Sequence, residues 1–375
     1  MTASLHQKLW QGGPVMVNVA FDPPKTLLAF AAFFRGCFTK RAYDSFTTYL
    51  SGLLMEHRRL SIESIAAKAP LAVYGRLQYF VSESKWSTEE VNTRRLAYLQ
   101  SKRSLAATGD GMLIIDDSAC PKPYARHTEA AEPQYAGCEK RVVRSHTFVG
   151  GVWANDSHYF PIDVKTYKPE SCFTQGKEDP AFRSKIQLAQ ELIDYTISNN
   201  IRFRDVIFDS WYLGKDFLRF LDERDLTWIS EAKGSQKVRY RHNWTRVDDL
   251  VNVIPPHKFA RTVTLPTCDG KERMFRLASF DTRLKSRPGK LRCVVAVGKW
   301  DERDQRGVHV FLTNRLSLLQ SLQERVIRLP SSGKPVTLGD ALRLHRLLND
   351  REAFKWTRKN GDLLKLIQLT DILAA

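Results

Sequence analysis

Two short apolar runs, each followed at once by an aspartate, constrain the fold more than any other feature of the sequence. Residues 112–115 precede Asp116, and residues 205–208, which end in Val-Ile-Phe, precede Asp209. A short apolar run without polar alternation is typical of a strand buried on both faces. The two runs therefore predict strands of a sheet that helices cover.

The segments around these runs predict the rest of a domain. Residues 146–153 and 158–164 flank the turn signal Ala-Asn-Asp-Ser and predict an antiparallel hairpin. Helices are predicted at residues 183–198 and 216–223, and a strand at 228–232. One face of the first helix carries Ile186, Ala189, Leu192, Ile193 and Ile197. This order of elements predicts a mixed α/β (α+β) domain over residues 109–233.

The N-terminal third has a helical pattern. After a loose lead-in at residues 1–25, residues 26–108 are predicted to form a helical DNA-binding domain. Ser61 is a candidate N-cap of one helix, and a break at Ala69-Pro70 separates that helix from a second at 72–81, which carries aromatic and basic residues. A helix-turn-helix and a plain helical hairpin both fit this outline, and the sequence leaves both open.

The last third contains a strand-rich region followed by a helical one. Residues 234–313 are strand-rich, with candidate strands at 259–265, 274–280, 291–297 and 308–312, and predict a β-rich insertion. Residues 314–375 predict a C-terminal helical tail that a loop at 329–334 interrupts.

The charge of the chain favours a polyanionic partner. The 58 Lys and Arg residues exceed the 41 Asp and Glu residues, which gives a formal charge of +17. Such a surplus fits nucleic acid, because each neutralised phosphate releases condensed counterions. A merely basic protein without that partner is the alternative.

Cysteine spacing and hydropathy indicate the cellular compartment of the protein. None of the six cysteines forms a CxxC pair, which argues against a zinc ribbon or a disulfide scaffold and predicts reduced, buried thiols. The most apolar run, residues 26–34, ends at Arg35 and is far shorter than the roughly 20 residues of a membrane span. We therefore expect a cytoplasmic protein without membrane insertion.

Asp116 and Asp209 are the candidate metal ligands. Acids at the carboxyl ends of neighbouring strands converge in an open sheet, and such a pair repels itself unless a divalent cation lies between them. Mg²⁺ favours oxygen ligands of this kind. Asp117 competes with Asp116, but adjacent residues of a strand point to opposite faces, so only one of them faces the site. The alternative is that each aspartate ends a strand or caps a helix.

The residues around these acids carry a family resemblance. Residues 114–118 with Lys122 soon after, residues 160–170, residues 206–212 and residues 311–315 resemble, in order, the signatures of DDE transposases of bacterial and archaeal insertion sequences. The resemblance covers roughly residues 50–316. It implies an RNase H-like catalytic core, of the branch with a β-rich insertion before the third acid.

The resemblance also implies roles for individual residues. Asp116 and Asp209 become the catalytic ligands of a two-metal site for Mg²⁺ (or Mn²⁺), while Asp117, Trp211 and Tyr212 pack beside it. The candidate contacts to DNA are Lys122, Lys165, Tyr167, Lys168 and Arg315, for which a solvated basic surface is the alternative. The implied partner is double-stranded DNA, both transposon ends and target, bound by a homodimer that pairs two ends.

The third acid is missing from the expected place. The family follows its last core strand with Tyr-x2-Arg-x3-Glu-x6-Lys, and none of Glu324, Asp350 and Glu352 has the required neighbours. An internal deletion is the simplest account. Two functions therefore stay open: a transposase, and a catalytically inactive derivative that still binds transposon ends. A third alternative, an unrelated RNase H-like nuclease, would leave the Asp-Ser-Trp-Tyr element at residues 209–212 and the β-rich insertion at residues 234–313 unexplained.

Overall fold

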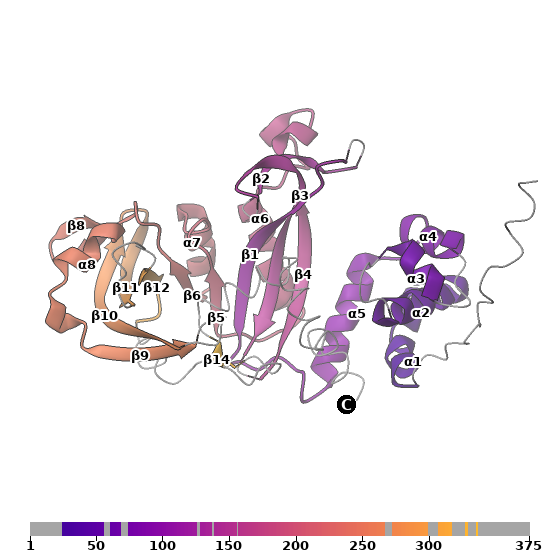
Figure 1. Cartoon of the computed structure of the whole chain (residues 1–375), viewed down its shortest axis with the longest axis horizontal. Helices are drawn as coiled ribbons and strands as arrows, with labels where there is room; N and C mark the ends of the chain where they lie inside the picture. Colours follow the sequence, from indigo (N-terminus) through magenta and orange to yellow (C-terminus); the bar gives the residue numbers. More distant parts are fainter. Residues whose placement is uncertain are drawn as a thin grey trace, which may run out of the picture. The chain divides into compact units, whose positions relative to one another are not determined.

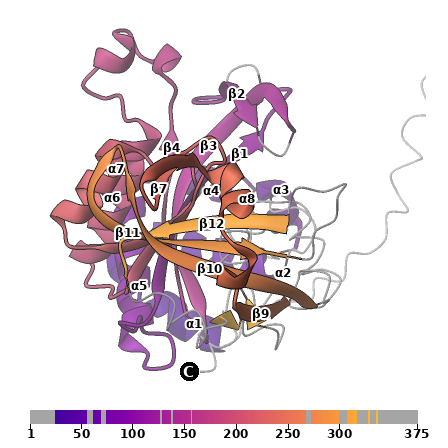
Figure 2. The same cartoon turned by 90° about the vertical axis from the view of Figure 1, so that its left-hand side faces the viewer.

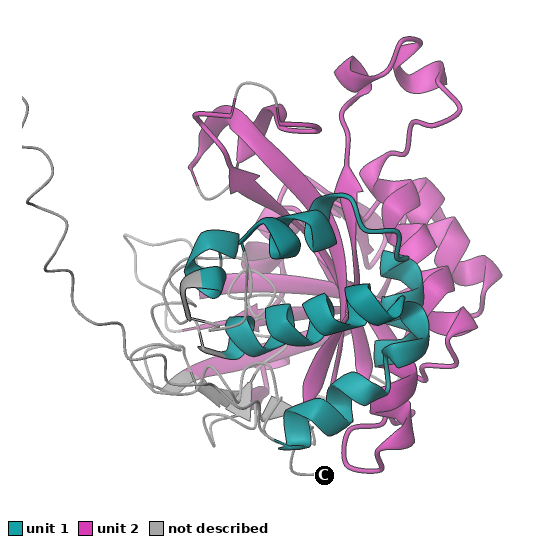
Figure 3. Ribbon diagram, turned by 90° about the vertical axis from the view of Figure 1, so that its right-hand side faces the viewer, with its two compact units in different colours: residues 1–95, 369–375 teal, residues 96–368 magenta. Residues whose placement is uncertain are grey.

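The fold is described from a computed structural model of the whole chain. The described residues are 25–55, 61–68, 74–125, 128–136, 139–155, 157–266, 272–298, 307–316, 327–328 and 335–336. The chain divides into two compact units, residues 1–95 with 369–375 and residues 96–368 (Figure 3). Each unit is described by itself.

The first unit is helical, as predicted. Its helices are α1 (Lys25–Ala32), α2 (Lys40–Met55), α3 (Ile62–Lys68), α4 (Tyr74–Ser82) and the first part of α5 (Thr88–Ser101). Ser61 caps α3 as expected, because its hydroxyl accepts a hydrogen bond from the Ser64 amide at 3.1 Å. Helices α2, α3 and α4 pack on one another. Gly52 is required there, since a β-carbon would lie 2.2 Å from the Ile65 side chain.

The second unit is built on a mixed sheet (Figure 1). Its core strands are β1 (Met112–Pro121), β3 (Arg141–Ala154), β4 (Tyr159–Tyr167), β5 (Asp205–Phe208) and β6 (Thr227–Glu231). Their order in the sheet is β4-β3-β1-β5-β6: the first three are antiparallel, and β1, β5 and β6 are parallel. The predicted mixed α/β fold with an RNase H-like core is confirmed.

Two helices cover one face of this core. Helix α6 (Lys185–Ser198) packs on β1, β3 and β4, and α7 (Lys215–Glu223) packs on β6 (Figure 1). Helix α6 begins with the reciprocal hydrogen bonds of a capping box between Ser184 and Gln187. Its buried face differs from the predicted one, because Ile186 is only half-buried and Ile197 is exposed. Leu188 and Thr196 are buried in their place, since the face of α6 that meets the sheet is rotated from the predicted one.

A close contact explains the glycine that directly precedes β1. The Trp153 indole stacks on Phe160 at 5.1 Å and donates a hydrogen bond to the Arg202 carbonyl at 2.8 Å. A β-carbon at Gly111 would lie 2.3 Å from that indole. Only glycine therefore lets the chain pass the buried tryptophan and enter the strand.

The predicted β-rich insertion continues the core sheet. Its strands are β7 (Lys237–Tyr240), β8 (Asn243–Arg246), β9 (Arg261–Pro266), β10 (Glu272–Leu284), β11 (Arg287–Val297) and β12 (Val308–Thr313), with the short helix α8 (Leu250–Val253). Strands β9 to β12 lie side by side in Figure 2. Strand β12 pairs with β6, so the described strands β1 to β12 form a single sheet.

Several elements differ from the predictions. Strand β1 is longer than the apolar run 112–115, because its pairing with β3 continues to Pro121. Strand β2 (Glu132–Ala136) and the β7–β8 hairpin were not predicted, since their residues lack an apolar run. In the predicted helical tail, the short strands β13 (Ile327–Arg328) and β14 (Pro335–Val336) pair antiparallel. Residues 314–316 of the tail are also described, whereas its other residues, and the lead-in apart from Lys25, lie outside the described residues.

The described cysteines are free thiols. Cys37 and Cys293 are buried as predicted, whereas Cys120, near the end of β1, and Cys172, the last residue of the short 3-10 helix Glu170–Cys172, are exposed. Cys138 and Cys268 lie outside the described residues. Within the described part of the chain, no helix is both long and apolar enough to span a bilayer.

Candidate active site

Sheet register brings Asp116 and Asp209 together. The parallel pairing of β1 with β5 ends at Ile115 and Phe208, so the two aspartates occupy the next register position on adjacent strands. Adjacent parallel strands bring such positions side by side, and the charge of Asp116 acts on Asp209, so the two carboxylates lie near each other. The sequence placed Asp116 after its strand, but it lies within β1, paired with Gly150, because β3 extends beyond β5 at this edge.

The two carboxylates interact electrostatically. Burial raises the pKa of Asp209, and the negative charge of Asp116 raises it further. Asp116 itself is buried, with 7% of its surface exposed. One oxygen of each carboxylate is oriented by a main-chain amide: the Asp117 amide donates to Asp116 Oδ1 and the Trp211 amide to Asp209 Oδ1, each at 2.8 Å. The acids are therefore close, oriented and mutually repulsive.

This donor set fits a divalent cation. Two neighbouring carboxylates are stabilised by a positive charge between them, and hard cations such as Mg²⁺ prefer their oxygens. Among the described residues, no group of three His, Cys, Asp or Glu side chains is arranged to hold a metal ion. The structure thus brings two carboxylates together, and no third acid of the described residues is arranged with them to hold a metal ion.

Asp117 lies on the opposite face of the sheet, as strand alternation predicts. Its carboxylate accepts a hydrogen bond from Lys185 Nζ at 2.7 Å, and the Tyr212 hydroxyl lies 3.5 Å from its other oxygen. Burial raises the pKa of Tyr212 well above its usual range, and Asp117 raises it further, so the phenol keeps its proton. Asp117 is therefore engaged by α6 and the turn after β5.

Trp211 and Tyr212 both flank the acids, but in different ways. Tyr212 is fully buried and packs on Phe217 of α7, whereas 47% of Trp211 is exposed. Their rings meet edge to face at 5.0 Å. The turn that follows Asp209 is thus held by Tyr212 and leaves much of the Trp211 indole at the surface.

Two of the candidate DNA contacts lie on the helix-covered face. Lys165 and Tyr167 share sheet rows with Asp117 and Ala119 through β3, so they point away from the Asp116 side. Lys165 forms an ion pair with Asp163 at 3.0 Å, and its ammonium lies 5.6 Å from the Tyr195 ring centre on α6. The register therefore separates both side chains from the paired acids.

The other candidate DNA contacts are dispersed. Lys122 is exposed just beyond β1, and Lys168 pairs with Glu129 at 2.5 Å. Arg315 lies at the other end of β5, where its guanidinium contacts the fully buried Asp205 at 2.8 Å. Their roles toward DNA stay predictions.

Two residues near the acids were not found from the sequence. Lys185 begins α6 and contacts Asp117, and no local pattern marks it because its partner is far away in the chain. Glu231 ends β6 at the register position beside Asp209, on the same face. Its carboxylate contacts His309 Nδ1 on β12 at 2.9 Å. The apolar run before Glu231 was the available signal, since acids after such runs marked the other two.

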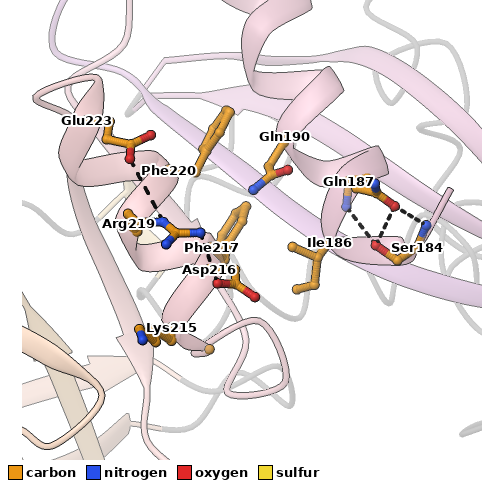
Figure 4. A pocket seen from close by; sticks show the side chains of 11 residues that line it. Ser184, Ile186, Gln187, Gln190, Lys215, Asp216, Phe217, Arg219, Phe220 and Glu223 are labelled. Carbon is orange, nitrogen blue, oxygen red and sulfur yellow. Dashed lines mark hydrogen bonds and ion pairs between the residues drawn. The ribbon is translucent and has the colours of Figure 1, made fainter.

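A cavity of about 580 Å³ lies between the start of α6 and α7 (Figure 4). Ser184, Gln187 and Phe220 are among its lining residues. Its charges have both signs, because Arg219 pairs with Asp216 and Glu223. None of the sequence-predicted site residues lines it, so the cavity is separate from the acid pair.

The sheet order and the acids at its carboxyl edge place the chain in the RNase H-like class. Residues 33–248 match the family model described as DDE superfamily endonuclease. That match spans more than half of the chain, which therefore belongs to the DDE superfamily endonucleases. The resemblance of its motifs to insertion-sequence transposases is thereby confirmed.

A curated relative agrees with this assignment. The chain is 26% identical over 204 residues to a probable transposase for insertion sequence element IS701 of Microchaete diplosiphon, and the alignment covers 53% of this chain and 51% of that protein. The chain thus spans about half the length of this curated relative. Among solved structures, the NurA nuclease from Sulfolobus solfataricus aligns with a TM-score of 0.32 and 9% identity, over 77% of this chain and 98% of the nuclease.

Proposed function

We propose that this protein is a DNA transposase in which Asp116 and Asp209 hold a divalent metal ion during DNA strand cleavage and strand transfer. The observation that carries the proposal is that Asp116 and Asp209 directly follow the last paired residues of β1 and β5, where the negative charge of Asp116 raises the pKa of Asp209. DDE superfamily endonucleases generally use divalent metals, which fits this donor set.

The reaction is two phosphoryl transfers. Water attacks a phosphodiester, the bond from phosphorus to O3′ breaks, and a 3′-hydroxyl and a 5′-phosphate result. The 3′-hydroxyl oxygen then attacks a phosphodiester of the target, joins the strands, and the displaced O3′ takes up a proton. When bound, Mg²⁺ or Mn²⁺ supplies activation of the attacking oxygen and stabilisation of the leaving oxygen.

The role of the protein is to keep two ionised carboxylates in place. The Trp211 amide fixes one oxygen of Asp209, and the Asp117 amide fixes one of Asp116. Both acids must lose their protons to bind metal, so the raised pKa of Asp209 sets a lower pH limit for metal binding. Burial of Asp116 restricts the approach of other ligands.

Double-stranded DNA is the proposed partner, with transposon ends and target bound by a homodimer. The surplus of 17 positive charges supports an electrostatic contribution to binding. Lys122, exposed beyond the end of β1, is the phosphate contact we favour on the core. In the helical unit, the packed helices α3 and α4 support a helix-turn-helix, with exposed Tyr74 and Tyr79 on α4 facing DNA.

A catalytically inactive DNA-binding derivative is the second candidate. It is favoured by the missing Tyr-x2-Arg-x3-Glu-x6-Lys pattern after Arg315. Loss of one ligand of a two-metal site removes several kcal/mol of transition-state stabilisation. Such a protein would hold transposon ends without cutting them.

A cleavage assay separates the two candidates. Purified protein is incubated with labelled DNA carrying the element's own ends, with Mg²⁺, Mn²⁺ or EDTA. Metal-dependent nicking that Asp209→Asn abolishes supports the transposase. End binding without nicking supports the inactive derivative, and neither binding nor nicking refutes both. Asp216→Asn, an exposed acid on α7, is the matched control.

A further inference from the structure

Lys185 occupies an unfavourable place for a cation. It is the first residue of α6, where the helix dipole presents its positive end, and its side chain is only 22% exposed. A cation held in such a place needs specific partners, and violations of local preference concentrate at functional sites. The partners that hold Lys185 in this place therefore point to a role in the site.

Three elements converge on the Lys185 ammonium. It pairs with Asp117 of β1 at 2.7 Å. It also lies 5.5 Å from the ring centre of Tyr167 on β4 and 5.4 Å from that of Trp211, in the turn after β5. Each ring is within the range of a cation–π interaction. One side chain thus connects β1, β4 and the turn that carries Asp209.

The turn transmits this contact to the acid. The Trp211 amide donates to Asp209 Oδ1 at 2.8 Å, and the Tyr212 amide donates to the Asp209 carbonyl at 3.2 Å. A change in the position of Trp211 therefore changes the hydrogen bonds that orient the Asp209 carboxylate. Lys185 also neutralises Asp117, whose charge otherwise adds to the repulsion at Asp209.

We propose that Lys185 is a positioning residue of the acid site. It clamps the turn at residues 209–212 against β1 and β4 and so presets the Asp209 carboxylate. The same ion pair occupies Asp117 on the helix-covered face, which leaves Asp116 as the β1 ligand. The link to metal binding rests on the proposed function, whereas the clamp itself can be tested without metal.

The first experiment is hydrogen exchange on the metal-free full chain. Lys185→Met removes the ammonium and keeps an unbranched side chain. We expect the Trp211 and Tyr212 amides to exchange at least tenfold faster than in the wild-type protein. Lys177→Met, which breaks an exposed pair with Glu170, is the matched control and should leave these amides unchanged. Unchanged exchange in a folded Lys185→Met protein overturns the proposal.

The second experiment is a Mn²⁺ titration of the same proteins by calorimetry. We expect Lys185→Met to weaken Mn²⁺ binding about tenfold, and Lys185→Arg, which keeps the charge, to recover most of the affinity. Wild-type affinity in Lys185→Met would refute the link to the metal. If the wild-type and Asp209→Asn proteins bind Mn²⁺ equally, the proposed function fails, while the exchange data still decide the clamp.

A double variant covers the case in which Lys185→Met does not fold. Asp117→Asn together with Lys185→Met leaves no unpaired charge, yet it removes the ammonium from both rings. We expect this protein to fold with fast exchange at Trp211 and Tyr212. Protection of these amides equal to the wild type would show that Lys185 does not hold the turn.

Discussion

At the scale of single residues, Asp209 illustrates a conflict between function and stability. Burial and the Asp116 charge raise its pKa above the usual value of an aspartate, so the folded state binds the proton more tightly than the unfolded state does. This group therefore stabilises the fold fully at pH values below its unfolded pKa, and that contribution is lost as pH rises through the folded pKa. The negative charge of Asp116 therefore makes ionised Asp209 less favourable in the folded protein.

Asp209→Asn should accordingly stabilise the metal-free protein at pH 7. Asparagine removes the charge while its oxygen can still accept the Trp211 amide. We expect the free energy of unfolding in urea with EDTA to rise by about 0.5–2 kcal/mol. The difference should shrink as pH falls through the raised pKa, because the wild-type Asp209 is then protonated. A variant less stable than the wild type at pH 7 would contradict the repulsion.

At the scale of elements, Arg315 joins the end of β12 to the start of β5. Its partner Asp205 is fully buried and also contacts Arg204 at 2.8 Å and Thr227 at 2.7 Å. Arg315→Ala should lower the free energy of unfolding by about 1–3 kcal/mol, because Asp205 loses one of its two charged partners and keeps Arg204 and the Thr227 hydroxyl. Urea denaturation measures this loss.

Arg219→Ala, which breaks exposed pairs on α7, should cost less than about 1 kcal/mol. Equal stability of the two variants, with weaker DNA binding by Arg315→Ala, would favour the predicted DNA contact instead.

Glu231 poses a separate question for strand β6. Its register position beside Asp209 resembles that of a third acid, but its carboxylate is directed to His309 on β12. We expect Glu231→Gln to change Mn²⁺ affinity less than twofold, as measured by calorimetry next to Asp209→Asn. A loss comparable to that of Asp209→Asn would show that Glu231 turns toward the metal and replaces the missing glutamate.

The sequence predicted the elements whose signal is local. Strand β5 was predicted at its observed bounds because Val206 to Phe208 are apolar and buried on both faces. The first four residues of β1 followed from the same kind of pattern, and the hairpin of β3 and β4 followed from the turn signal between its strands. Strand β2 was not predicted because exposed residues alternate with less exposed ones along it and no apolar run marks it. Its strand conformation is defined by its pairing with β3.

The same distinction applies to the site. Asp116 and Asp209 could be predicted because each follows a buried run at one edge of the sheet. Lys185 could not, because its partners Asp117, Tyr167 and Trp211 become neighbours only through sheet register and the packing of α6. The face of Lys165 likewise depends on pairing of β4 with β3, which no local pattern contains.

At the scale of the whole molecule, two different units share one basic chain. The helical unit packs α2, α3 and α4 around a small core, and the sheet unit carries the acids and the continuous twelve-stranded sheet. Contacts to phosphate require only surface position and positive charge, whereas the acid site requires register. Electrostatic binding to DNA and metal binding should therefore respond to different variants.

The salt dependence of DNA binding tests this separation. If the surplus of 17 positive charges neutralises phosphates, the logarithm of the association constant falls linearly with the logarithm of salt concentration, by about 0.9 for each phosphate contacted. We expect fluorescence anisotropy with EDTA to give similar slopes for a duplex of the element's ends and a random duplex.

Lys122→Ala should reduce the slope by about one. Lys165→Ala should leave it unchanged, because that ammonium is engaged by Asp163 and Tyr195. Asp209→Asn should not reduce the slope either, since it removes no positive charge. An affinity that stays flat between low and moderate salt would exclude phosphate contacts as the purpose of the charge.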